Sequence, residues 1–117
     1  MCSFAMAQPL PPNEAVAELI NAMGDDDVRT IVRTFLRDFP TSIRELATAD
    51  RKNGRRLAHR MKSESRMMGA TNLSRRMLEI QERLTPETGA ELTPSDLSAI
   101  ALEYAEIAAA LRKYVGD

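Results

Sequence analysis

The chain of 117 residues carries 16 lysines and arginines against 17 aspartates and glutamates, which gives a formal net charge of −1. This mixed charge argues against nucleic acid as the main partner, since nucleic acids attract a basic field, and no stretch approaches the ~20 apolar residues of a membrane-spanning helix. The single cysteine, Cys2, excludes an internal disulfide, and without a Cys or His cluster we expect no metal site.

Residues 1–12 are predicted to be a flexible lead-in, because three prolines interrupt any regular period there. Residues 13–117 are expected to form one helical domain, in the cytoplasm and without a membrane partner. Asn13 is the predicted N-cap of a short helix that Gly24 ends. The apolar stripe of this helix comprises Val16, Leu19, Ile20 and Met23.

The second helix is predicted to begin at the acidic run 25–27, because carboxylates interact favourably with a helix N-terminus. Pro40 interrupts its apolar pattern, so we expect a kink or a restarted turn near Asp38. Two separate helices are the alternative. The predicted core face holds Val28, Val32, Phe35, Phe39, Ile43 and Leu46.

Asp50 is the predicted N-cap of a central helix that runs from about Arg51 to Gly69. The Asn53-Gly54 pair is also a turn signal that could delay the helix start. At about 100° per residue, the stripe that faces the core comprises Leu57, Met61 and Met68.

The only histidine, His59, falls with Lys62 and Arg66 on the side of this helix opposite the apolar stripe. We therefore expect the imidazole in solvent, with a lysine ammonium one turn away. The small side chains of Ser63 and Ala70 leave its approach open, so another protein can reach it.

The next helix is predicted to be capped by Thr71 or Asn72. Gln81 lies at the edge of its apolar stripe, from where it can reach toward the preceding antiparallel helix. The stripe itself comprises Leu73, Met77, Ile80 and Leu84.

After a loop over residues 85–92, Thr93-Pro94-Ser95-Asp96 offers an N-cap, a proline at the first helical position and an acid at the third. Four main helices with short connections predict an all-α fold, an antiparallel up-down-up-down four-helix bundle with a short extra N-terminal helix. The apolar stripe of the last helix comprises Leu97, Ile100, Ala101, Tyr104, Ile107, Ala108, Leu111 and Val115.

The segment 58–70 resembles the histidine-containing phosphotransfer (HPt) domain, whose signature is Ala-His-x-Leu-Lys-Gly-x-Ser/Ala followed by a Gly-Ala pair. The family also often has a glutamine on the next helix near the histidine, and Gln81 stands at the matching place. The signature residues matched here are Ala58, His59, Met61 in place of leucine, Lys62, Ser65, Gly69 and Ala70.

This resemblance implies that His59 accepts a phosphoryl group from a receiver-domain aspartate or a kinase and passes it to another receiver. Lys62 would stabilise the phosphoryl charge and Gln81 would orient the imidazole by a hydrogen bond. Ser63, Ser65, Gly69 and Arg66 would support the site.

Two positions depart from the family pattern. Ser63 replaces the usual glycine and is small enough to leave the imidazole open. Glu64 replaces a small residue near the apolar stripe, where an unpaired carboxylate is costly. We expect it to reach solvent or to pair with an arginine, with Arg75 and Arg76 of the next helix as candidates.

The implied partners are response-regulator receiver domains, a hybrid histidine kinase, or both, and the chain is expected to act as a monomer. Without a glycine-rich nucleotide loop it is predicted to be a phosphocarrier without kinase activity of its own. It needs no intrinsic cofactor, because Mg²⁺ would come with the receiver. Arg55 and Met67 are predicted to contribute to docking.

Two other functions stay open at this point. The Ser63 and Glu64 departures allow an adaptor or inhibitor that docks on a receiver or kinase without exchanging phosphate. The basic strip Arg51–Arg66 could instead bind nucleic-acid phosphates, although it lacks interleaved aromatic residues for base stacking.

Overall fold

The computed structural model describes residues 10–87 and 89–116, and the described chain contains helices and no strands. This confirms the predicted all-α class. The predicted lead-in falls mostly on residues 1–9, which lie outside the described residues. The helices are α1 (Glu14–Met23), α2 (Asp25–Thr48), α3 (Arg51–Met67), α4 (Thr71–Arg83) and α5 (Pro94–Val115).

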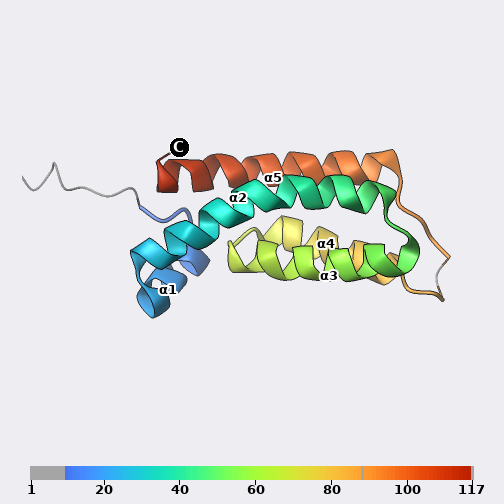
Figure 1. Ribbon diagram of the computed structural model, residues 1–117, viewed down its shortest axis with the longest axis horizontal. Coiled ribbons are helices and arrows are strands. Elements are labelled where there is room, and N and C mark those ends of the chain that lie inside the picture. The colour runs from blue at the N-terminus through green and yellow to red at the C-terminus, as the bar shows by residue number, and fades with distance from the viewer. Residues whose placement is uncertain (1–9, 88, 117) are drawn as a thin grey trace, which may run out of the picture.

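The four longer helices pack side by side, and α1 lies against the start of α2 (Figure 1). Helix α2 contacts α3 and α5, α4 also contacts both of these helices, and the α3–α4 contact is the most extensive. The chain reverses direction along the long axis of the molecule after each of α2, α3 and α4 (Figure 1).

Side-chain caps start three of the helices as the sequence predicts. Asn13 accepts from the Val16 amide, Asp50 accepts from the Asn53 amide, and Thr93 forms a reciprocal capping box with Asp96. Each cap satisfies an amide that has no partner inside its own helix. The Asn53-Gly54 pair therefore does not delay α3.

The predicted cap of α4 is wrong. Thr71 and Asn72 lie inside the helix, and its N-cap is Ala70, whose side chain forms no capping bond. The chain turns tightly at Gly69, which has φ +75°, and the Ala70 amide donates to the Ser65 carbonyl at 2.9 Å. This turn places helical backbone immediately after Ala70.

Most of the predicted apolar stripes are buried in one core, but several members are not. Met23 is 43% exposed because it ends a short helix that packs mainly on α2. Ala101 is exposed because it directly follows the buried Ile100, so the helix rotates its side chain away from the core. Tyr114, which the stripe omitted, is almost fully buried. The partly buried members are Leu19, Ile20, Ile43, Leu97 and Ile107.

Helix α2 continues through Pro40, so neither a restarted turn nor two separate helices occurs there. A proline has no backbone N–H, which leaves the carbonyl four residues earlier without its helical donor. In α2 this carbonyl belongs to Leu36, and it accepts a hydrogen bond from the Tyr104 hydroxyl of α5 at 2.9 Å. A side chain from another helix therefore replaces the bond that Pro40 removes.

The start of α2 is joined to the end of α5 by a group of contacts that we call the terminal clasp. The Tyr114 hydroxyl donates to Asp25, and Asp25 also pairs with Arg29. The Arg29 guanidinium lies 4.5 Å from the Tyr114 ring centroid and donates to the Tyr114 carbonyl. Arg33 donates to the Val115 carbonyl. These bonds satisfy carbonyls at a helix end that has no partners of its own.

Candidate functional site

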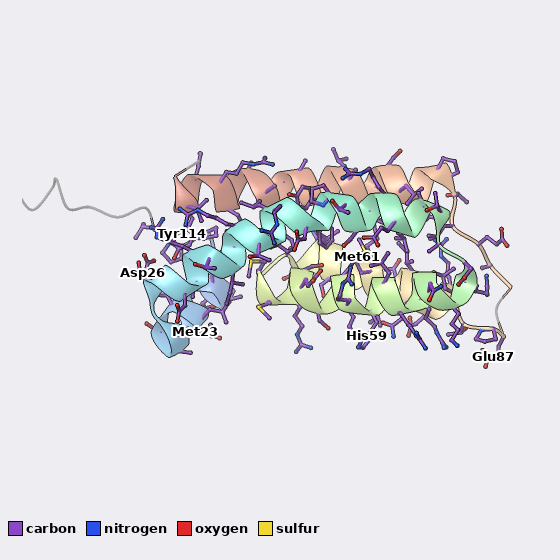
Figure 2. All side chains as sticks on the ribbon, in the orientation of Figure 1. Met23, Asp26, His59, Met61, Glu87 and Tyr114 are labelled. Carbon is purple, nitrogen blue, oxygen red and sulfur yellow. The ribbon has the colours of Figure 1, made fainter. Side chains whose placement is uncertain are left out.

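His59 projects from α3 into solvent, as expected from the helical spacing. Ala58, directly before it, and Met61, two residues after it, are both fully buried, which fixes the inward face of α3. Figure 2 shows Met61 between the helices and His59 on the outer side of α3. The buried stripe therefore directs the imidazole outward.

Gln81 of α4 is the residue that reaches the imidazole from another helix. Its Oε1 lies 3.4 Å from His59 Nδ1, a long hydrogen bond. Gln81 is partly buried at the edge of the α4 stripe, where the sequence placed it. The structure thus brings together two residues that are 22 positions apart.

Lys62 follows His59 by one turn on the same side of α3 and is partly buried. Its backbone carbonyl accepts from the Ser74 hydroxyl of α4 at 3.2 Å, so this turn is held against α4. No carboxylate in residues 10–87 and 89–116 forms an ion pair with the Lys62 ammonium. Its charge is available to an incoming anion.

The two serines of the motif lie in different surroundings. Ser63 is exposed, and its hydroxyl donates to the His59 carbonyl at 3.3 Å. Ser65 is fully buried and donates to the Met61 carbonyl. The structure therefore places Ser65 in the core, away from the imidazole, where only a small side chain fits between the packed helices.

Gly69 is required by the backbone at the α3–α4 turn. A Cβ added there would lie 2.3 Å from the Asn13 side chain, and the φ of +75° is itself unfavourable for other residues. Asn13 donates from Nδ2 to the Met68 carbonyl at 3.0 Å. The N-cap of α1 thus also anchors the turn after α3, a second role that sequence spacing does not reveal.

Glu64 pairs with Arg60 of its own helix at 3.8 Å, so the prediction of Arg75 or Arg76 as its partner is wrong. Arg76 instead pairs with Glu103 of α5. The Glu64 side chain is 40% exposed, and burial raises the pKa of its carboxyl above the usual value, while the Arg60 charge opposes that shift.

Met67 is 45% exposed and borders an apolar groove between α2 and α3. It follows His59 by eight residues, which places it about 12 Å along the helix and about 80° round it, on the α2 side. The groove is lined by Thr30, Ile31, Thr34, Phe35, Asp38, Phe39, Glu64, Met67 and Met68.

The basic strip of α3 is not one continuous exposed surface. Arg51 donates to the backbone carbonyls of Arg83 and Thr85 and so holds the end of α4. Arg60 donates to Ser42 at 3.1 Å. Arg55, one turn before His59, is partly buried on the same side as the imidazole.

Within the described part of the chain, no three His, Cys, Asp or Glu side chains gather closely enough to hold a metal ion. None of the helices there combines the length and apolar character that crossing a membrane requires.

Comparison with known protein families identifies a match. Residues 13–110 match the family model described as Hpt domain, which covers nearly the whole chain. Neither the curated proteins nor the solved structures contain a significant match.

Proposed function

Because the chain belongs to the Hpt domain family, whose members are phosphocarrier modules of two-component phosphorelays, we propose that it carries the phosphoryl group on His59. Hpt domains interact with receiver domains and kinases. The observation that supports His59 as the acceptor is its exposed imidazole with Nδ1 facing Gln81.

The Gln81 contact assigns different tasks to the two ring nitrogens. With the amide oxygen as acceptor, Nδ1 carries the ring proton, which leaves the lone pair on Nε2. Nε2 attacks the phosphorus of an aspartyl phosphate, the bond from phosphorus to the carboxylate oxygen breaks, and the carboxylate leaves. The Nδ1 proton stays on the ring, where Gln81 stabilises the positive charge that develops.

Lys62 supplies the electrostatic part of the transfer. A phosphoryl group carries negative charge on three oxygens, and its transfer depends mostly on positioning and charge stabilisation. The Lys62 ammonium lies one turn from the imidazole, and no carboxylate of the described residues forms an ion pair with it. It attracts the group in the forward direction and stabilises phosphohistidine afterwards.

The surroundings of His59 are cationic, so we place the Mg²⁺ of aspartyl-phosphate chemistry on the receiver. The chain would then need no cofactor and no kinase activity of its own. A receiver would dock on the His59 side of α3, with Arg55 beside the imidazole and Met67 at the apolar groove. We expect the chain to act as a monomer and to bind no nucleic acid.

Replacement of His59 by glutamine tests this function. His59→Gln is expected to abolish uptake of phosphoryl from a receiver charged with acetyl phosphate and Mg²⁺, with the far-UV helical signal unchanged because the side chain is exposed. The label on the wild-type chain should be acid-labile, as phosphohistidine is.

Transfer and mere docking give different results in this assay. A non-exchanging adaptor would bind the charged receiver and acquire no label. Continued labelling of His59→Gln would assign the acceptor role to another residue.

A further inference from the structure

A cationic hollow lies beside His59 on the α3–α4 face. We call it the basic hollow; it is lined by Lys62, Arg66, Thr71, Ser74, Arg75 and Leu78. Lys62 and Arg66 follow His59 by about 4.5 and 10.5 Å along α3, within about 60° of its direction. On α4, Leu78 is one turn before Gln81, which contacts the imidazole.

The cations of the basic hollow have no carboxylate partner among the described residues. The ion pairs found among the described residues involve Arg29, Arg37, Arg60, Arg76 and Arg83. Lys62 and Arg66 take part in none of them, and Arg75 contacts only the Asn72 amide oxygen, at 3.3 Å. Three like charges around one hollow repel one another, so an external anion would be attracted there.

The side of α3 that faces α2 has a different distribution of charge. The apolar groove toward α2 carries the carboxylates of Asp38 and Glu64, whereas the basic hollow toward α4 carries no carboxylate. Both carboxylates are paired with arginines, Asp38 with Arg37 and Glu64 with Arg60. A partner centred on His59 therefore meets neutralised charges on the α2 side and cations without carboxylate partners on the α4 side. Such a charge pattern fixes the orientation of a docked protein more than it adds affinity.

Leu78 adds an apolar contact to the basic hollow, since it is 39% exposed. We propose that the basic hollow recognises a surface of the exchanging receiver that presents two or more carboxylates and one apolar side chain. The site thereby selects which receivers exchange phosphoryl with His59. This inference rests on the proposed phosphotransfer function and adds the chemistry of the partner to it.

The test uses the receiver domain that exchanges phosphoryl fastest with the wild-type chain, chosen from the receivers of the source genome. Arg75→Glu is expected to raise the receiver concentration for half-maximal transfer about 10-fold at low ionic strength, with the maximal rate kept. Arg66→Glu, the second exposed cation, should give the same shift. Added salt should weaken the wild type more than either variant, because screening removes an attraction that the variants lack.

Matched controls separate recognition from general charge. Arg75→Lys keeps the charge and should remain near wild type. Lys113→Glu makes the same charge change on an exposed position of α5 and should leave transfer unchanged. A receiver with one docking carboxylate reversed to lysine should recover exchange with Arg75→Glu.

Several outcomes would overturn the proposal. Unchanged half-maximal concentrations in Arg75→Glu and Arg66→Glu would remove the basic hollow from recognition while phosphotransfer stands. An equal effect of Lys113→Glu would show that the shift comes from net charge and not from the basic hollow. A lowered maximal rate alone in Arg75→Glu would assign Arg75 to the chemistry. Absence of exchange between any receiver and the wild-type chain would overturn the proposed function as well.

Discussion

Gln81 Oε1 lies 3.4 Å from His59 Nδ1, and in the proposed mechanism this contact keeps the ring proton on Nδ1 and leaves Nε2 free. Gln81→Leu removes the acceptor for the Nδ1 proton, so the share of rings with the proton on Nε2 should rise. A neutral hydrogen bond contributes about 1 kcal/mol, which corresponds to about a fivefold loss in the rate of phosphoryl uptake. Nitrogen-15 NMR of the ring reports the tautomers.

Gln81→Glu serves as the control for this change, because a carboxylate oxygen still accepts from Nδ1. In Gln81→Glu the ring proton should remain on Nδ1. Identical spectra for the wild type and Gln81→Leu would show that the 3.4 Å contact does not set the tautomer.

Gly69, the glycine of the family signature, has a structural role. Gly69 permits the left-handed turn and leaves space for Asn13, whose amide bridges α1 to the Met68 carbonyl. The signature thus combines residues of two kinds. His59 and Lys62 lie on the outer side of α3, whereas Gly69 and the buried Ser65 let the helices approach one another.

Helix α2 depends on α5 at the position where its own hydrogen bonding fails. Tyr104→Phe leaves the Leu36 carbonyl without the donor that replaces the missing Pro40 amide, so the free energy of unfolding should fall by about 1–2 kcal/mol. Urea unfolding measures it. In Pro40→Ala the residue 40 amide can donate to Leu36, so the same tyrosine replacement should cost about 1 kcal/mol less.

This double-mutant cycle tests the link between the two helices directly. The aromatic packing of Tyr104 on Phe39, with stacked rings 5.3 Å apart, is kept by phenylalanine in both backgrounds. Strictly additive costs would show that the hydroxyl does not compensate for the proline.

The elements whose signals are local were predictable from the sequence. Asn13, Asp50 and Thr93 cap helices within three residues of themselves, and a helical period orients His59 away from Met61. The cap of α4 was not predictable, because the turn at Gly69 makes a side-chain cap unnecessary. Contacts distant in sequence were also missed, since spacing says nothing about which surfaces meet. The Tyr104–Leu36 bond and the Asn13–Met68 bond are examples.

For the whole molecule, the terminal clasp makes stability depend on pH in two ranges. The Tyr114 hydrogen bond, and then Arg29, lower the pKa of Asp25, so its contribution is present above about pH 4 and lost as pH falls through the lowered value. Burial, and then Asp25, raise the pKa of Tyr114 to about 12. Its contribution is present below about pH 10 and lost as pH rises toward 12.

Thermal unfolding across pH checks both ranges. Asp25→Asn should flatten the acid range, whereas Asp27→Asn makes the same charge change at an exposed neighbouring position and should not. Tyr114→Phe should remove part of the loss between pH 10 and 12. Parallel curves for Asp25→Asn and Asp27→Asn would exclude the clasp as the source of the acid dependence.

The α3–α4 hairpin is fastened at both ends, by Arg51 on the last carbonyls of α4 and by the Gly69 turn at the other end. The side chains proposed to act on the phosphoryl group, His59, Lys62 and Gln81, therefore all belong to one continuous segment, residues 51–83. The basic hollow lies in the same run, so sequence changes confined to α1, α2 or α5 leave both the reactive side chains and the proposed recognition site intact.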